Sequence, residues 1–338
     1  MDLNIMWFVL VAVLIIGYAI LDGFDLGVGV LHLLTKDENE KRINLNAIGP
    51  VWDGNEVWLL TAGGALFAAF PVVYATVFSA FYLALMLLLF ALIFRAVSME
   101  FRGKVDSPKW KKYWDNAFGI SSLLAATLFG VAIGNILRGI PLNQDGIFTG
   151  NFFMLLNPYS ILVGVLSLVL FIMHGAIYLT LKTDGQQKER VIALIPKFWI
   201  AFVSLYFIVT LYTMFEAKYL FNSILGNPLF YLFFLLLLAG IIYIPVGVKS
   251  GRFGRTFLAS SVAITMMICL MALSMFPNLV PSSIDPEFSL NIYNASSTQR
   301  TLETMLIIAL VGMPLVVGYT IIIYRIFKGK VKLNEHSY

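Results

Sequence analysis

Charged side chains are scarce in this sequence. Asp, Glu, Lys and Arg make up 12% of the 338 residues, whereas hydrophobic residues make up 59%. A typical soluble domain has about 25% charged residues. The chain has too few polar side chains to cover the surface of a water-soluble domain, so the sequence predicts an integral membrane protein.

Cysteine and histidine are also rare. The one cysteine, Cys269, excludes an internal disulfide, a CxxCH haem attachment and a thiolate metal cluster. The three histidines are His32, His174 and His336. No Walker A, GxGxxG, HExxH or GxSxG motif occurs in a usable context, and no segment indicates a nucleic acid as partner.

Long apolar runs dominate the rest of the chain. A helix needs about 20 mainly apolar residues to cross the hydrocarbon layer. The first run lacks the basic flank and cleavage site of a signal peptide, so we expect it to be retained. The sequence predicts one polytopic membrane domain over residues 1–338, with nine spans at about 5–32, 49–70, 73–97, 115–137, 158–181, 191–215, 228–248, 255–276 and 302–325.

The second span is the least certain by composition, because Asp53 and Glu56 interrupt it. The distribution of basic residues argues for it. All Lys and Arg except Arg138, Lys218 and Arg300 fall in five segments, namely 36–42, 95–112, 182–197, 249–255 and 325–332. These segments share one side only if 49–70 spans, as the positive-inside rule requires. We therefore expect the N-terminus outside and the C-terminus in the cytoplasm.

Ionisable residues inside membrane helices are costly and tend to mark ion or proton routes. Here they gather in the first three predicted spans. With the orientation above, all of them fall in the cytoplasmic part of the protein. The sequence predicts a proton pathway made of Asp22, Asp25, Trp52, Asp53, Glu56, Glu100 and Lys104.

The acids of this group occur in pairs. Asp22 and Asp25 are three residues apart, as are Asp53 and Glu56, so each pair is expected on one face of a helix. Two like charges at that spacing repel by roughly 3 kcal/mol at an effective dielectric constant near 20. We therefore expect each pair to hold about one exchangeable proton.

The alternative is that these acids are structural. They would then cap helices, pair with Arg95 or Lys104, or lie in the wet interfacial zone. Residue count favours function for Asp22, Asp25 and Asp53, which lie deeper in their spans. Gly23 and Gly27 flank the first pair and have the spacing of close helix packing.

His174 lies in the middle of the fifth predicted span. Histidine is a common axial ligand of haem iron, so His174 is a candidate haem ligand. The competing interpretation is a hydrogen-bonded interior histidine. The scarcity of histidine argues against a bis-His site for two haems.

Several literal motifs resemble a known family. They are LDGFDLGVG (residues 21–29), WDGNEVWL (52–59), TAGGALFAA (61–69), GNFFMLLNP (150–158) and, late in the chain, MFP (275–277), PSS (281–283) and SSTQ (296–299). Together they resemble subunit II of bacterial cytochrome bd quinol oxidases, and the similarity covers nearly all spans.

The resemblance implies an all-α integral membrane protein with nine transmembrane helices, which we expect as two four-helix bundles plus one peripheral helix. It implies a multi-pass subunit in the bacterial cytoplasmic membrane. Its partner would be a subunit I that holds haems b and d, in a non-pumping enzyme that oxidises quinol and reduces oxygen to water. No cofactor is expected in this chain, although a structural quinone or lipid and a small accessory subunit are further candidates.

In this family, subunit II is thought to provide cytoplasmic proton entry. By matching motif, that role falls on Asp25, Trp52, Asp53, Glu100 and Lys104. Glu100 replaces an aspartate expected in some relatives, which keeps the acid on a longer side chain. The two rival functions are a proton-coupled secondary transporter and a purely structural membrane subunit.

Overall fold

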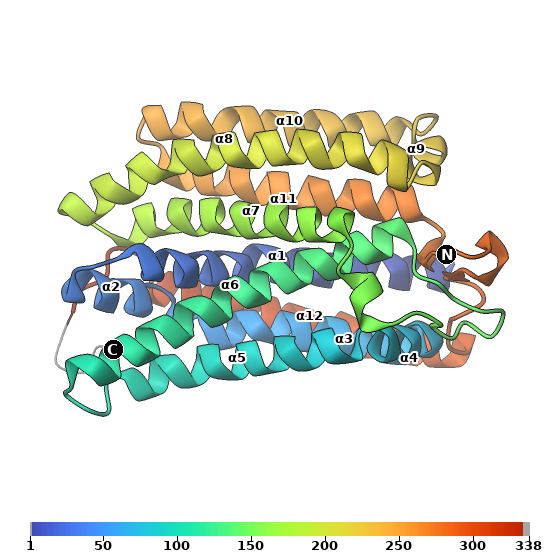
Figure 1. Cartoon of the computed structure of the whole chain (residues 1–338), viewed down its shortest axis with the longest axis horizontal. Coiled ribbons are helices and arrows are strands. Elements are labelled where there is room, and N and C mark those ends of the chain that lie inside the picture. Colours follow the sequence, from blue (N-terminus) through green and yellow to red (C-terminus); the bar gives the residue numbers. More distant parts are fainter. Residues whose placement is uncertain (1, 334–338) are drawn as a thin grey trace.

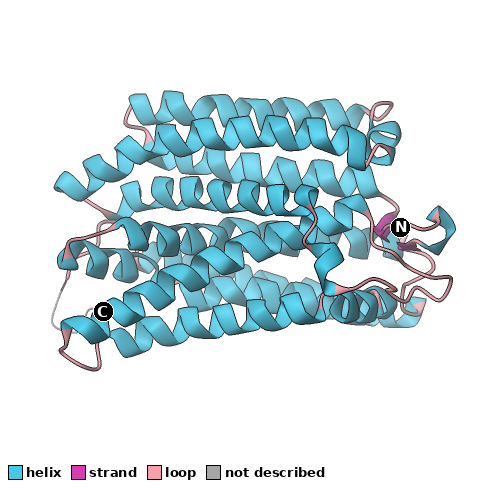
Figure 2. Cartoon of the chain, viewed as in Figure 1, coloured by secondary structure: helices cyan, strands magenta, loops and turns pink. Residues whose placement is uncertain are grey.

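Helices make up almost the whole chain (Figure 2). The computed structural model describes residues 2–333. Its elements are α1 (Leu3–Leu34), α2 (Glu38–Ile48), α3 (Trp52–Ala69), α4 (Pro71–Ala80), α5 (Tyr82–Arg102), α6 (Pro108–Arg138), η1 (Phe152–Leu155), α7 (Pro158–Lys182), α8 (Gly185–Glu216), α9 (Tyr219–Ile224), α10 (Pro228–Lys249), α11 (Phe253–Met275), β1 (Asn278–Val280), η2 (Pro286–Phe288), β2 (Leu290–Asn291) and α12 (Gln299–Ile326).

The long helices lie side by side in two groups (Figure 1). Helix α1 packs on α3 and α6, and α5 packs on α6. Helices α7, α8, α10 and α11 form the second group, which joins the first where α7 packs on α1 and α6. Helix α12 lies at the edge, mainly against α3 and α1. The predicted all-α fold of two bundles and a peripheral helix is confirmed.

Within residues 2–333, eight helices are long and apolar enough to cross a membrane, which is close to the predicted nine. The exact count is not confirmed, because α3, the second predicted span, is not among the eight. It has 18 residues and so measures about 27 Å at 1.5 Å per residue. The predicted third span is two helices, α4 and α5, with Phe81 between them.

The two ends of the helix assembly differ in character (Figure 1). At one end lie α2, the α5–α6, α7–α8 and α10–α11 turns and the residues after α12, which together carry most of the basic residues; we call this the basic end. At the opposite, loop end, the segments after α6 and after α11 pack together. There the amide of Ile140 donates to the carbonyl of Pro281 at 3.1 Å.

Prolines begin helices more often than they interrupt them. Pro71, Pro108, Pro158 and Pro228 are the first residues of α4, α6, α7 and α10, where the missing N–H costs no helical hydrogen bond. Three other prolines lie inside helices that continue through them. They are Pro196 in α8, Pro245 in α10 and Pro314 in α12.

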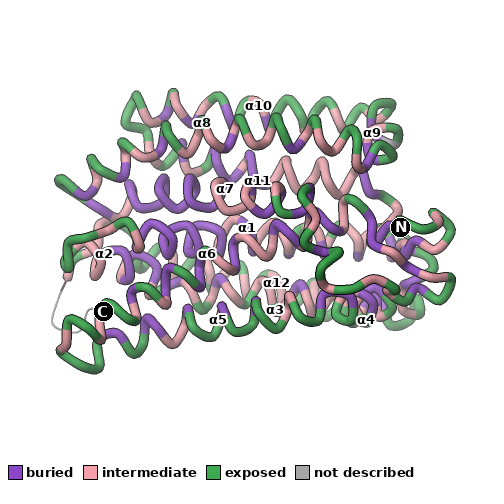
Figure 3. Tube along the Cα trace, viewed as in Figure 1, coloured by how far each residue is buried: buried purple, intermediate pink, exposed green. Residues whose placement is uncertain are grey.

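Helix α1 is the centre of the molecule and is buried without a break from Asp22 to His32 (Figure 3). Its glycines explain this close packing. A Cβ on Gly27 would overlap the carbonyl oxygen of Phe171 in α7 and lie 3.1 Å from the Cα of Gly175. The backbones of α1 and α7 therefore touch, and the acids of α1 lie deep inside the protein.

Candidate functional site

Asp22 forms a buried ion pair with Arg95. Nη1 of Arg95 in α5 lies 2.8 Å from Oδ1 of Asp22 in α1, and the two side chains are 1% and 0% exposed. A charge so far from water is stable only when it is paired. Arg95 therefore makes it possible for an aspartate to lie in the middle of a membrane helix.

The same guanidinium also faces Glu56 of α3. Its Nη2 lies 3.5 Å from Oε2 of Glu56, whose side chain is 19% exposed. One cation thus joins carboxylates from two helices. Asp25 is a third carboxylate nearby. If all three carboxylates were ionised, three negative charges would face the one positive charge of Arg95 in a poorly hydrated region, which is unfavourable. This set of groups is suited to holding exchangeable protons.

Asp25 has a different partner. Nδ2 of Asn55 in α3 donates to Oδ2 of Asp25 at 2.8 Å and to the carbonyl of Leu21 at 3.2 Å. The hydroxyl of Tyr324 in α12 donates to Oδ1 of Asn55 at 2.9 Å. A hydrogen-bonded chain therefore runs from α12 through α3 to α1. We call Asp22, Asp25, Asn55, Glu56, Arg95 and Tyr324 the buried polar cluster.

The other oxygen of Asp25, Oδ1, is buried and has no hydrogen-bond partner among residues 2–333. Buried polar atoms are normally satisfied by protein or by water. A narrow cleft between α3 and α12 is lined in part by Pro50, Asn55 and Tyr324, so it reaches the two residues that lead to Asp25. Its volume of about 20 Å³ is enough for one water molecule.

The predicted proton-pathway residues separate into two sets. Asp22, Asp25 and Glu56 lie in the buried polar cluster, whereas Asp53, Glu100 and Lys104 are exposed near the basic end. Trp52 is partly buried against the hydrophobic core. Asp53 and Glu56 lie three residues apart in α3, and of the two acids Glu56 faces Arg95.

Sequence reasoning did not assign Asn55 or Tyr324 to the site. The signal for Asn55 was present, because an amide beside two acids in a membrane helix is unusual. Tyr324 could not have been found, since it is 269 positions from Asn55 in the chain. Arg95 was named only as a possible structural partner of the acids.

A second ionic cluster joins four helices at the basic end. Asp115 of α6 accepts from Nε2 of His32 at 2.7 Å, from Nζ of Lys41 at 2.9 Å and from Nε of Arg102 at 2.6 Å. Arg102 also bonds to Glu38 of α2 at 2.9 Å. Asp115 thus compensates cations from α2 and α5 and is hydrogen-bonded to His32 of α1, which makes this group an anchor for the basic end.

His174 is enclosed in α7 and uses both ring nitrogens. Its Nδ1 lies 2.7 Å from Oγ of Ser260, and its Nε2 lies 3.1 Å from the carbonyl of Ile20. The ring stacks on Phe257 at 4.7 Å and is 0% exposed. This geometry does not fit a haem ligand, because neither nitrogen is free to bind iron. Within residues 2–333, no group of three or more His, Cys, Asp or Glu side chains could hold a metal ion.

Comparison with solved structures supports the fold. The bd oxidase of Geobacillus thermodenitrificans contains a chain that superposes with a TM-score of 0.81 and 17% sequence identity, covering 97% of this chain and 99% of that one. At this identity the likeness establishes the architecture alone.

Sequence comparison is more specific. Residues 3–327 match the family described as cytochrome bd terminal oxidase subunit II. The chain is 38% identical to the probable cytochrome oxidase subunit 2 of Haemophilus influenzae, with 98% of this chain and 96% of that protein aligned. It is 36% identical to the cytochrome bd-I ubiquinol oxidase subunit 2 of Escherichia coli K12 and to the cytochrome bd ubiquinol oxidase subunit 2 of Bacillus subtilis, with 99% of this chain and 98% of each relative aligned. This chain therefore belongs to the cytochrome bd terminal oxidase subunit II family and is a membrane subunit of a bacterial quinol:oxygen oxidoreductase that works with an oxidase subunit I.

Proposed function

We propose that this subunit carries protons from the cytoplasm towards the oxygen-reducing haem of subunit I, and that the haems b and d are held by subunit I. Reduction of oxygen to water consumes protons, and these must cross part of the membrane to reach a buried haem. In this proposal the basic end faces the cytoplasm, as expected from the concentration of Lys and Arg there.

The observation that carries the proposal is the chain Tyr324–Asn55–Asp25. Its members are joined by hydrogen bonds of 2.9 and 2.8 Å. The small cleft between α3 and α12 reaches Asn55 and Tyr324 from the surface and has room for one water. Asp25 is the internal acid that receives the proton. The chain holds its Oδ2, and its Oδ1, which has no partner within residues 2–333, is the oxygen left open to protonation.

Asp22, Arg95 and Glu56 would set the charge of the route. The guanidinium of Arg95 neutralises one negative charge of the nearby carboxylates at all times. Any further ionised carboxylate therefore carries an uncompensated charge, which attracts a proton from the aqueous side. Asp53, Glu100 and Lys104 are exposed near the basic end and would collect protons at the mouth of the route. Trp52 would shield the inner part.

The test is the variant Asp25→Asn in the assembled two-subunit complex, with Asp106→Asn as the matched control. Asp106 is an exposed aspartate outside the cluster, paired with Lys111 at 2.8 Å. We expect haem content, measured by absorption, to be unchanged in both. Quinol-driven oxygen consumption should fall at least about 10-fold for Asp25→Asn only, since positioned proton-transfer groups contribute about 10²–10⁴-fold.

A purely structural role is the second candidate, and the two buried ion-pair groups around Arg95 and Asp115 favour it. On that view, Asp25→Asn would lower the yield of complex and leave the turnover per haem unchanged. A full turnover rate in haem-replete Asp25→Asn would therefore reject proton transfer through this residue.

A further inference from the structure

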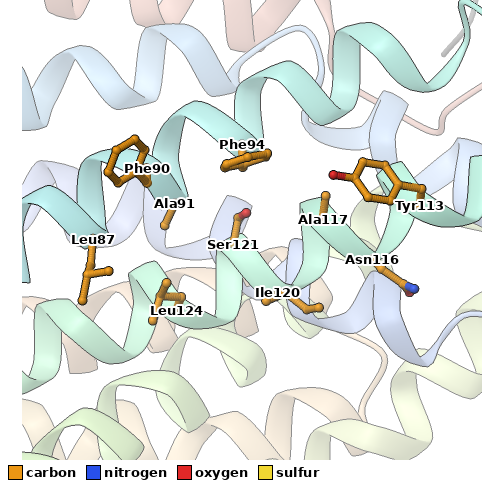
Figure 4. Close-up of a pocket in the computed structure, with 10 residues that line it drawn as sticks. All are labelled: Leu87, Phe90, Ala91, Phe94, Tyr113, Asn116, Ala117, Ile120, Ser121 and Leu124. Atoms are coloured by element: carbon orange, nitrogen blue, oxygen red, sulfur yellow. The ribbon is translucent and has the colours of Figure 1, made fainter. Parts of the chain in front are cut away.

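A groove runs between α5 and α6 on the outside of the molecule (Figure 4). It encloses about 370 Å³ and is lined by apolar side chains of both helices, among them Phe90, Phe94, Ile120 and Leu124. From Tyr113 to Leu124 it follows α6 for 11 residues, or about 17 Å. Its volume is within the range of about 300–1,000 Å³ typical of small-molecule sites.

The end of the groove nearest the basic end is polar. Tyr113 and Asn116 line it, and both are exposed. Lys109 and Lys112 precede them by four residues each, so helical spacing places these lysines on the same face of α6, one turn closer to the end of the helix. The sequence along this face therefore runs from cationic to amphipathic to apolar.

The charges of Lys109 and Lys112 have no counter-charge among the described residues. Neither lysine forms an ion pair with any residue from 2 to 333. The neighbouring cations are engaged elsewhere, since Lys111 pairs with Asp106, and Lys41 and Arg102 pair with Asp115. Two free ammonium groups thus lie beside the groove mouth.

Aromatic side chains mark the level of the membrane interface here. The indole of Trp110 donates to the carbonyl of Phe101 at 2.8 Å, and its ring packs on Trp114 at 5.6 Å. Trp and Tyr concentrate where headgroups meet hydrocarbon. Lys109 and Lys112 therefore lie at headgroup level, and Phe90, Phe94, Ile120 and Leu124 lie at the level of the acyl chains.

We propose that the α5–α6 groove binds one anionic phospholipid, with its phosphate between Lys109 and Lys112 and an acyl chain along the groove. The order of cation, polar group and apolar channel matches the order of phosphate, glycerol ester and acyl chain. Basic pockets between membrane helices on the cytoplasmic side bind anionic headgroups in this way. A neutral isoprenoid molecule would fill the apolar part but would leave both lysines without a counter-charge.

The experiment is native mass spectrometry of the assembled complex, titrated separately with phosphatidylglycerol and with zwitterionic phosphatidylcholine. The lysine variant is Lys109→Gln with Lys112→Gln. Its matched control is Lys328→Gln with Lys332→Gln, which removes the same charge from the same end away from the groove. A second variant, Ala117→Phe, fills the groove with a large side chain.

We expect one phosphatidylglycerol to be retained in preference to phosphatidylcholine. The lysine variant should weaken its binding about 30-fold, which corresponds to about 2 kcal/mol for two lysines, and the control should not. Ala117→Phe should reduce retention of both lipids. If Ala117→Phe fails to assemble, as judged by haem absorption, the comparison of the lysine variant with its control alone tests the proposal.

Equal retention of the two lipids would overturn the proposal, and so would equal losses in the lysine variant and its control. Finding that the retained molecule is a neutral quinone insensitive to the lysine variant would also overturn it. Absence of bound lipid because subunit I covers the groove would overturn the proposal as well.

Discussion

Arg95 and Asp22 form an ion pair of 2.8 Å in which both side chains are buried. The pair joins α5 to α1, and the second contact of Arg95, with Glu56, adds α3. Three helices of the first bundle are thus held by a single guanidinium. Because the apolar attraction between helices is weak in lipid, such polar contacts have a large share in fixing helix positions.

Removing Arg95 should be more damaging than removing the whole pair. We expect Arg95→Gln to destabilise the assembled complex by about 3–5 kcal/mol, because it leaves buried carboxylates uncompensated. Asp22→Asn combined with Arg95→Gln should recover part of that loss. Thermal unfolding of the four complexes in a double-mutant cycle measures the coupling, and strictly additive effects would contradict a functioning ion pair.

Tyr324→Phe tests the outer step of the proposed proton route. It removes one hydroxyl, which donates to Asn55, and leaves the ring in place. We expect haem content to be unchanged and oxygen consumption to fall several-fold, with a larger fall at high pH, where protons are scarce. Tyr82→Phe is the control, because Tyr82 is exposed at the start of α5. Equal rates in the two variants would remove Tyr324 from the route.

Asp115→Asn should loosen the basic end. Asp115 pairs with Lys41 and Arg102 and is hydrogen-bonded to His32. Its neutralisation leaves Lys41 without this ion pair and Arg102 with Glu38 alone, and breaking such a buried pair costs about 3–5 kcal/mol. Limited proteolysis of the α2 region and thermal unfolding of the complex would detect this. A thermal midpoint equal to that of the unmodified complex would show that the cluster is not an anchor.

Asp106→Asn provides the contrast. The hydrogen bond and charge of Lys111 hold the pKa of Asp106 below its usual value. A carboxyl with a lowered pKa adds stability above its ordinary pKa and loses it as the pH falls through the lowered value. Because this pair is exposed, we expect no measurable change in thermal midpoint at neutral pH.

Gly27→Ala should prevent normal packing of α1. The added Cβ would overlap the carbonyl oxygen of Phe171, and backbone cannot move aside as a flexible side chain can. We expect a large loss of assembled complex in the membrane, measured by haem absorption per unit of protein. Gly254→Ala in α11 is the control, because a Cβ there meets no atom within 4 Å. Equal yields would show that α1 and α7 can separate at no cost.

His174→Leu should leave the haem absorption bands of the assembled complex unchanged. Both ring nitrogens already have partners, in Ser260 and Ile20. The cost should appear in stability, because the variant loses the hydrogen bonds of the ring to Ser260 and Ile20, which are worth about 0.5–1.5 kcal/mol each. Loss of one haem band from an otherwise intact complex would revive a ligand role for His174.

The sequence alone determined the class of the protein and which region carries its chemistry. An apolar run of about twenty residues forms a helix in lipid, because only a helix satisfies all the backbone hydrogen bonds within one segment. The clustering of basic residues identified one end of the helix assembly. Acids such as Asp22, Asp25 and Glu56 were recognisable because charge is costly in hydrocarbon. These are properties of single segments, which a linear pattern records.

Only the tertiary structure decided which of these residues meet. Sequence spacing placed Asp53 and Glu56 together on one helix, but it did not show that Glu56 faces Arg95 of α5 while Asp53 is exposed. Asp115 is bonded to His32, which is 83 positions away. Asp25 is bonded to Asn55, which in turn meets Tyr324 from 269 positions away. The physical reason is that helix rotation and pairing are set by contacts such as Gly27 with Phe171, which depend on two surfaces at once. The spacing of Gly23 and Gly27 marks a packing face on α1 but does not identify the helix that packs there.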